Sequence, residues 1–176
     1  PTILAGLVAW PADEAPTVLA FLRDFMADAP DEVGLMANLR LAPALPMFPE
    51  HLHGRPIIGL VATYAGPVEK GERVLAPVRA LGHPVLDTIA PKPYAAHQKF
   101  LDPAVPHGRY YYWKSHRLVP LTGDVIDTIC EHLATISSPL STVPIFSFGG
   151  AMSRVAEDAT AFPHRDASHD INIVAS

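Results

Sequence analysis

A short cluster near the end of the chain combines residue types that can bind an anion or transfer a proton. His164 and Arg165 follow an aromatic residue and a proline, so a titratable imidazole stands beside a permanent cation. A little earlier, an apolar segment is interrupted by Gly149 and Gly150. Paired glycines in a strand pattern mark a bulge or a close approach of the backbone to another group. We therefore expect a site wall here, or a contact with an anionic cofactor.

The same cluster has a purely structural interpretation. Arg165 can pair with Asp158 or Asp166, and His164 can be a ring that is satisfied within the fold. Gly149 and Gly150 shape a bulge more readily than they cradle a phosphate, because no Walker loop or dinucleotide fingerprint lies nearby. The residues alone leave both interpretations of His164 and Arg165 open.

The second candidate is the aromatic segment 109–117, RYYYWKSHR. If it is a strand, its side chains alternate between two faces. One face carries Tyr110, Tyr112, Lys114 and His116. The other carries Arg109, Tyr111, Trp113, Ser115 and Arg117. We expect the first set to be a substrate platform, in which rings stack and polar tips orient a ligand. Composition alone also allows aromatics that pack under helices while Lys and Arg extend at the sheet edge.

Two further candidates are weaker. His51 and His53 can share one face of an extended segment, as two metal ligands would, but no third ligand is close in sequence. A solvated or hydrogen-bonded pair in a loop is the better interpretation. Cys130 lies on the apolar stripe of a predicted helix, so we expect a buried core thiol and no nucleophile.

Hydrophobic periodicity defines the elements that must position these residues. Strands are predicted at 2–10, 33–41, 57–64, 85–89, 109–118, 142–148 and 171–174. Helices are predicted at 13–27, 66–81 and 123–136, with one helical turn within an irregular segment at 91–108. Gly82 suits a helix C-terminus and Thr122 an N-cap, whereas Gly71 and Pro77 argue against an undisturbed second helix.

The order of these elements favours an α+β fold, an antiparallel β-sheet with helices packed on one face in ferredoxin-like layers. A β-α-β-β order occurs twice, which indicates a structural duplication without a sequence repeat. Because the strands carry large apolar and aromatic residues on both faces, we expect a missing partner over the second face.

Composition limits the classes of function. The 176 residues suit one domain, 49% of them are hydrophobic, and a net charge of −5 disfavours nucleic-acid binding. We find no apolar run long enough to cross a membrane and no secretory signal, so we expect a cytoplasmic protein. The chain starts at Pro1 and stops at Ser176 directly after a strand pattern, so we expect a piece of a longer protein.

Several segments together resemble one enzyme family. The pairing of GGAMSRV with FPHR, at 149–155 and 162–165, resembles the late segment of berberine-bridge-enzyme-like FAD-linked oxidoreductases, in the vanillyl-alcohol-oxidase group of flavoproteins. LVAWP at 7–11, the segment 66–81, PKPY at 91–94 and YYWKS at 111–115 agree in order. The resemblance covers nearly the whole chain.

This resemblance implies a function for the longer protein. In the family, one domain holds FAD and a second domain, a sheet backed by helices, closes over the flavin and binds substrate. The chemistry is hydride transfer from a C–H bond to the flavin, and substrates range from sugars to secondary metabolites. Residues 1–176 match only the substrate-binding domain. The resemblance thus implies an FAD-binding domain outside this chain, and a chain that neither holds FAD nor reacts alone.

The resemblance also implies roles for the candidate residues. The residues expected to contact the substrate are Tyr110, Tyr112, Lys114, His116 and His164. Those expected to contact the flavin are Gly149, Gly150 and Arg165. Two alternatives remain open: a stand-alone small-molecule-binding module, and a dimeric α/β-barrel protein or cofactor-free oxygenase that pairs its exposed sheet faces as a homo-oligomer.

Overall fold

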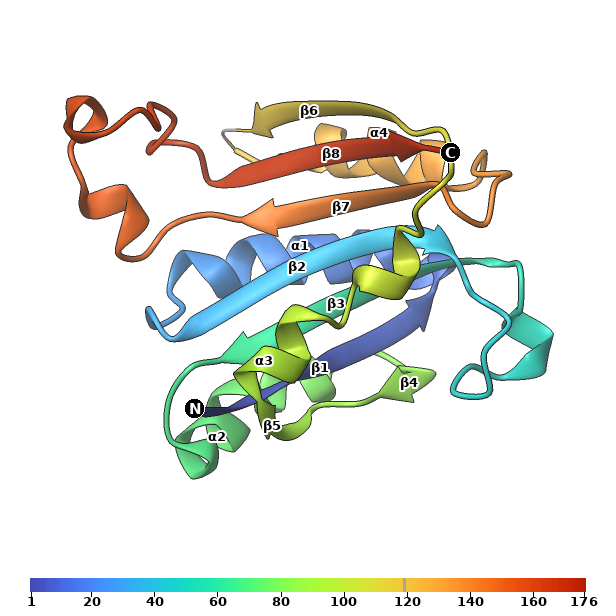
Figure 1. Cartoon of the computed structure of the whole chain (residues 1–176), viewed down its shortest axis with the longest axis horizontal. Coiled ribbons are helices and arrows are strands. Elements are labelled where there is room, and N and C mark those ends of the chain that lie inside the picture. The colour runs from blue at the N-terminus through green and yellow to red at the C-terminus, as the bar shows by residue number, and fades with distance from the viewer. Residues whose placement is uncertain (119) are drawn as a thin grey trace.

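One antiparallel sheet dominates the protein (Figure 1). A computed structural model describes residues 1–118 and 120–176. These residues form an eight-stranded sheet with the order β4-β1-β3-β2-β7-β8-β6, and β5 also pairs with β1. The strands are β1 (Thr2–Pro11), β2 (Val33–Leu41), β3 (Pro56–Tyr64), β4 (Leu86–Asp87), β5 (Ala90–Pro93), β6 (Tyr112–Leu118), β7 (Thr142–Ser147) and β8 (His169–Ala175).

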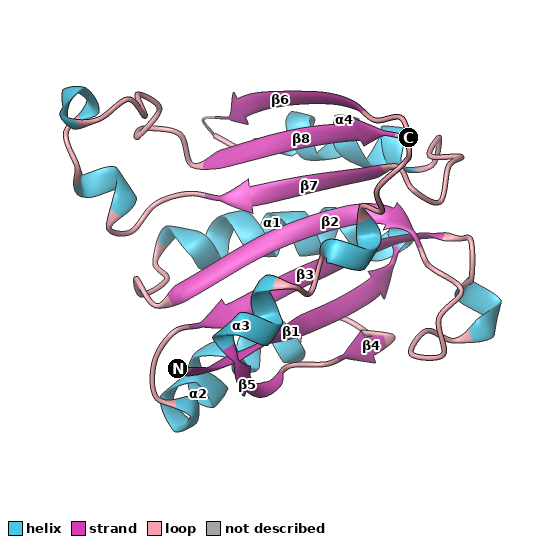
Figure 2. Ribbon diagram, in the orientation of Figure 1, coloured by secondary structure: helices cyan, strands magenta, loops and turns pink. Residues whose placement is uncertain are grey.

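The three long helices cover one face of this sheet, and a short helix lies on the other (Figure 2). The long helices are α1 (Ala15–Ala27), α2 (Val68–Arg79) and α4 (Gly123–Leu133). The short helix is α3 (Tyr94–Gln98). The predicted α+β class, an antiparallel sheet with helices on one face, is confirmed.

The strand order explains the repeated β-α-β-β pattern. In the first half, β1, α1, β2 and β3 place their strands in the order β1-β3-β2, and β4 adds beside β1 as in a ferredoxin-like sheet. In the second half, β6, α4, β7 and β8 place their strands in the order β6-β8-β7. The two halves join through the antiparallel β2–β7 pair. The duplication expected from the element order is thus present in the topology.

The main core lies between the sheet and the helices. Alternate residues of β1 point to this side, among them Leu4, Val8 and Trp10, all fully buried. Val18 and Leu22 of α1 meet them at helical spacing. Burying each such side chain contributes roughly 1.5–3 kcal/mol. The helices are held by this packing more than by intrinsic propensity.

Gly71 lies inside α2 because the helix passes close to a buried ring. A Cβ at this position would stand 2.7 Å from Cδ1 of Tyr64 and 3.1 Å from Cδ2 of Leu4. Tyr64 is fully buried and cannot move aside cheaply. The glycine that weakened the helix prediction is therefore what lets the helix approach the sheet. Gly82, just beyond the helix, has the positive φ of 53° that suits its predicted place at a helix end.

Several predicted boundaries differ from the structure. The strand expected at 85–89 is only two residues long, and β5 forms inside the segment expected to be irregular. The aromatic strand starts at Tyr112 instead of residue 109, and the last strand begins earlier, at His169. In each case tertiary pairing with β1 or β8 sets the ends, which local sequence does not encode.

The face opposite the long helices, here called the open face, is covered unevenly. Over β1, β3 and β2, a loop carrying Phe48 and Leu52 packs a small second core against the sheet. The segment from α3 to β6 crosses in front of the sheet (Figure 1). Over β7, β8 and β6 the face lacks such a second core and is here called bare; it carries polar side chains together with Trp113, Phe146 and Val174. The expectation of large apolar and aromatic residues on both faces thus holds fully for the first half and in part for the second.

No helix in the described part of the chain is both long and apolar enough to span a bilayer.

Candidate functional site

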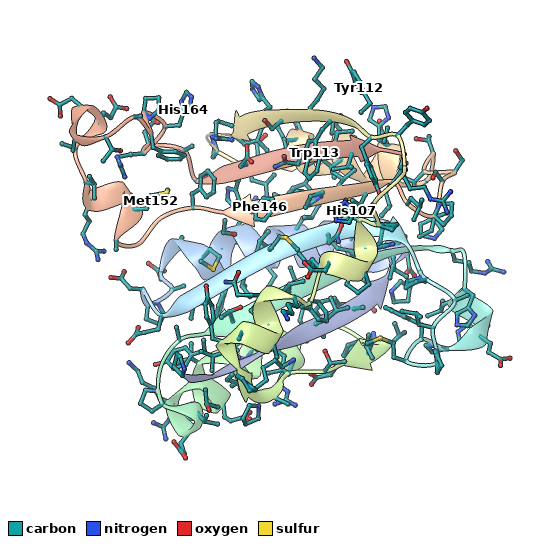
Figure 3. All side chains as sticks on the ribbon, viewed as in Figure 1. His107, Tyr112, Trp113, Phe146, Met152 and His164 are labelled. Carbon is teal, nitrogen blue, oxygen red and sulfur yellow. The ribbon has the colours of Figure 1, made fainter. Side chains whose placement is uncertain are left out.

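The register of β6 against β8 decides which side chains reach the bare part of the open face. Ile171 pairs with Ile145 and belongs to the helix-side core, so alternate residues of β8 point the other way. These are Asp170, Asn172 and Val174, which lie opposite Arg117, Ser115 and Trp113 of β6. In Figure 3, Trp113 and Phe146 lie on the near side of the sheet.

These open-face side chains form a continuous polar network. Trp113 donates its Nε1–H to Oδ1 of Asn172 at 2.7 Å. Asn172 in turn donates from Nδ2 to Oδ2 of Asp170 at 2.7 Å. Arg117 donates to the other carboxylate oxygen of Asp170 and forms an ion pair with it. Each polar group on this strand pair therefore fixes the orientation of the next.

Burial differs sharply along the network. Asp170 and Asn172 are 7% and 9% exposed, whereas Trp113 is 52% exposed. Phe146, on β7, is 37% exposed on the same face. The arrangement presents two aromatic side chains above a rigid, internally neutralised polar floor. Such a surface suits stacking against a flat ring, with an oriented amide at its edge.

Arg117 also connects the network to the cluster that contains the Phe-Pro-His-Arg motif. Its guanidinium carbon lies 5.4 Å from the ring centroid of Phe148 and 5.8 Å from that of Phe162. Arg165 lies on Phe162 as well, at 5.6 Å. Phe162 is therefore held by two cations through cation–π contacts. This packing ties the loop before β8 to the end of β6.

The hydrogen bonds of Arg165 stay within its own loop. Its Nη1 donates to the carbonyl oxygen of Met152 at 3.1 Å, and its Nη2 donates to Oγ1 of Thr160 at 2.6 Å. Neither carboxylate considered from the sequence, Asp158 or Asp166, is its partner. His164 next to it is exposed and points away from the sheet, at the outer loop (Figure 3).

Gly149 and Gly150 lie on the helix side of the loop, in a crevice lined also by Arg23 and His169. Both glycines have positive φ, 142° and 58°, which favours glycine there. A Cβ on Gly150 would lie 3.1 Å from Oδ1 of Asp31. The space beside this backbone is thus occupied by a carboxylate that pairs with Arg154. The glycines shape the turn.

The residues of the predicted substrate platform do not lie on the open face. Tyr112, Lys114 and His116 do share one face of β6, and Lys114 lies over the Tyr112 ring at 5.5 Å. That face is the helix side, because His116 pairs with Ile171. Tyr110 precedes the strand and is 98% exposed. The alternation was predicted correctly, but the face opposite the helices carries the other set, with Trp113, Ser115 and Arg117.

A separate apolar pocket of about 260 Å³ lies over the first half of the open face. Its floor is formed by side chains of β1, β2 and β3, and its walls by the loop after β2 and the segment after α3. His97 of α3 anchors this cover, since its Nε2 lies 2.9 Å from Oγ1 of Thr63 on β3. Burial, with a smaller effect of Lys92, lowers the pKa of His97, so its ring favours the neutral state.

Two groups discussed from the sequence have structural roles. The Nε2 of His53 lies 3.1 Å from the carbonyl oxygen of Phe48, so this ring takes the hydrogen-bonded role within its loop. Cys130 is half-buried on α4 and packs at the edge of the main core. Burial and the neighbouring Asp127 raise the pKa of its thiol, which disfavours the reactive thiolate.

Sequence reasoning missed Asp170 and Asn172. In the pattern His169-Asp-Ile-Asn-Ile-Val174 they alternate with Ile171 and Ile173, so a two-residue period places them together on the face opposite the two isoleucines. The strand was predicted to begin at Ile171, which hid the alternation.

Comparison with known proteins finds sequence similarity to one FAD-linked oxidoreductase and a fold shared with solved structures. No family model matches it. An FAD-linked oxidoreductase from Dictyostelium discoideum is 27% identical over 114 residues, which are 64% of this chain and 25% of that protein.

Solved structures share the fold over almost the entire chain. A BBE-like protein from Arabidopsis thaliana superposes with a TM-score of 0.74 at 18% identity, covering 99% of this chain and 37% of that one. Aclacinomycin oxidoreductase gives 0.76 at 18% identity, with the same 99% and 37% coverage. A chitooligosaccharide oxidase gives 0.71 at 16% identity, covering 99% and 39%.

These relatives are much longer than the chain, which spans a quarter of the curated relative and under two fifths of these solved structures. The resemblance drawn from the sequence is confirmed: the chain is similar to an FAD-linked oxidoreductase and has the fold of one part of berberine-bridge-enzyme-like proteins.

Proposed function

We propose that residues 1–176 are the substrate-binding domain of an FAD-dependent oxidoreductase, and that the open face turns toward the flavin and the substrate. The observation that carries this proposal is the bare half of the sheet, where Trp113 and Phe146 lie exposed above a buried polar network. Exposed aromatic side chains rimmed by polar groups are typical of a surface that contacts a ligand or another domain.

The residues present fit one part of FAD and not another. The crevice at Gly149 and Gly150 holds Asp31, and both arginines that line it, Arg23 and Arg154, already pair with carboxylates, so it does not suit the diphosphate. The aromatic side chains of the open face suit the flat ring system. The dinucleotide half of the cofactor is therefore assigned to a domain outside this chain, and the isolated chain is expected to bind no FAD. The bound flavin would supply the hydride acceptor.

Within this arrangement, the residues of the chain orient the substrate and exclude water. Trp113 offers a ring whose tilt is fixed by its hydrogen bond to Asn172. Asn172 is held by Asp170, and the Asp170 charge is balanced by Arg117. The network is thus a positioning device for a small alcohol, sugar or secondary metabolite.

Substitutions on the two faces of β6 test the proposal in the flavin-containing protein. Trp113→Phe keeps an aromatic ring but removes the hydrogen-bond donor to Asn172. We expect the turnover rate, measured as oxygen consumption, to fall ~10-fold. Lys114→Ala, one residue along and on the helix side, is the matched control and should stay within about twofold. Equal losses for both variants would contradict the assignment of the open face.

A further inference from the structure

The apolar pocket on the first half of the open face contains one charged group. Arg40, on β2, is the only ionisable side chain among the described residues that line it. The other lining residues, apart from Asn38, have no polar side chain. Three of these, Leu45, Met47 and Leu101, are large apolar side chains at least 38% exposed. The rim as well as the floor is therefore apolar.

The guanidinium of Arg40 has no acidic partner. Its Nε donates to the carbonyl oxygen of Leu41 at 3.3 Å and its Nη2 to that of Pro139 at 3.1 Å. Within the described chain no carboxylate forms an ion pair with it, and its Nη1 donates no hydrogen bond to a described group. Burial of the half-buried group lowers the pKa of Arg40, because desolvation disfavours the charged form.

The pocket therefore combines a hydrocarbon lining with an unpaired cation. A carboxylate suits Arg40 because it neutralises the charge and accepts charge-assisted hydrogen bonds. A polyhydroxylated ligand does not suit the lining, which apart from Asn38 and Arg40 offers no polar side chain to bind hydroxyl groups. At about 260 Å³ the pocket is smaller than the roughly 300–1,000 Å³ of sites for drug-sized molecules.

We propose that this pocket binds a small carboxylic acid with an apolar body, with the carboxylate on Arg40 and the hydrocarbon against the sheet and the segment at 100–104. Binding itself requires only this chain. That the ligand is the substrate of the flavoprotein, or a part of it, rests on the proposed function, because the pocket and the Trp113 network share the open face.

Calorimetric titration of the 176-residue chain with octanoate and with octanamide, its neutral counterpart, tests the proposal. We expect saturable binding of one octanoate per chain, and roughly tenfold weaker binding of octanamide, since a hydrogen-bonded charge pair is lost. Arg40→Gln should abolish this preference while retaining octanamide binding, which also shows that the variant is folded. Arg55→Gln changes an exposed arginine immediately before β3. This variant is the matched control and should bind like the original chain.

A second variant keeps the test decisive if Arg40→Gln fails to fold. Ala104→Phe fills the pocket from its outer wall without changing the sheet, and should weaken both ligands at least tenfold. Equal affinity for octanoate and octanamide, or no saturable binding of either, would overturn the proposal. Such a failure would not bear on the proposed role as a domain of an FAD-dependent oxidoreductase. Conversely, octanoate binding by a protein that never carries flavin would overturn the proposed function alone.

Discussion

Asp170 and Asn172 are nearly buried although they lie on the bare half of the sheet. Their polar atoms bind one another and Arg117, so the cost of removing them from water is offset within the network. The open face is consequently neutral and rigid at this point, and the exposed aromatic groups above it are what remains for a partner or ligand.

Replacing Asp170 should reveal this dependence. Asp170→Asn keeps the shape but leaves Arg117 without its counter-charge, so the free energy of unfolding in urea should fall by about 2 kcal/mol. Asp24→Asn removes an exposed ion pair with Arg23 and is the control, for which no measurable change is expected. An Asp170→Asn variant as stable as the original chain would show that the network is dispensable.

His169 should make stability depend on pH. Burial, and then the positive charge of Arg23, lower the pKa of this ring, and its Nε2 has no hydrogen-bond partner in the described chain. Below about pH 6.5 the unfolded chain binds a proton at this residue, whereas the folded chain keeps the ring neutral to lower pH. The free energy of unfolding should therefore fall on acidification. Urea unfolding at several pH values should show a smaller loss in His169→Gln.

The exposed His164 provides the comparison for this pH series. His164→Gln replaces a histidine that is exposed to solvent, so it controls for the loss of a histidine side chain as such. If His169→Gln and the original chain lose stability equally on acidification, the ring is not held neutral by burial.

At the scale of elements, the two helical glycines behave differently. Gly71→Ala gains helix propensity worth about 1 kcal/mol, but its methyl group meets the buried Tyr64 ring, so we expect a net loss of about 1–3 kcal/mol. Gly123→Ala, at the start of α4, meets nothing within 4 Å and should be neutral or slightly stabilising. Thermal unfolding of both variants checks this, and a more stable Gly71→Ala variant would contradict the close packing of α2.

Periodicity predicted the elements well and their surroundings poorly. The 3.6-residue spacing in α1 and the two-residue spacing in β6 were both correct, because each depends only on neighbouring residues. Which side of β6 faces the helices depends on its register with β8, far along the chain, and local sequence does not contain that information. The side chains of the predicted substrate platform on β6 therefore lie on its helix side.

The partners of the candidate residues could not be predicted for a related reason. Arg165 was expected to pair with a nearby aspartate or the flavin, but it binds the carbonyl of Met152, and no side-chain pattern signals a backbone acceptor. The pocket at Arg40 is assembled from three strands and two loops. Such a cavity depends on how distant segments pack, which no single motif encodes.

At the scale of the whole molecule, the symmetric strand order gives the open face two different halves. The half over β1, β3 and β2 holds the apolar pocket, and the half over β7, β8 and β6 holds the polar network. Pairing of exposed sheet faces between two copies remains a prediction, which sedimentation of the 176-residue chain can test.

The central claim is that this sheet is one side of a flavin site whose other side lies in a longer protein. Intact-mass analysis and an absorbance spectrum of the protein purified from its natural source test this most directly. We predict a species much larger than 19.0 kDa with one flavin per chain, and colourless material for residues 1–176 alone. A native 19.0 kDa protein without flavin, or a 176-residue chain that holds flavin stoichiometrically, would contradict the claim.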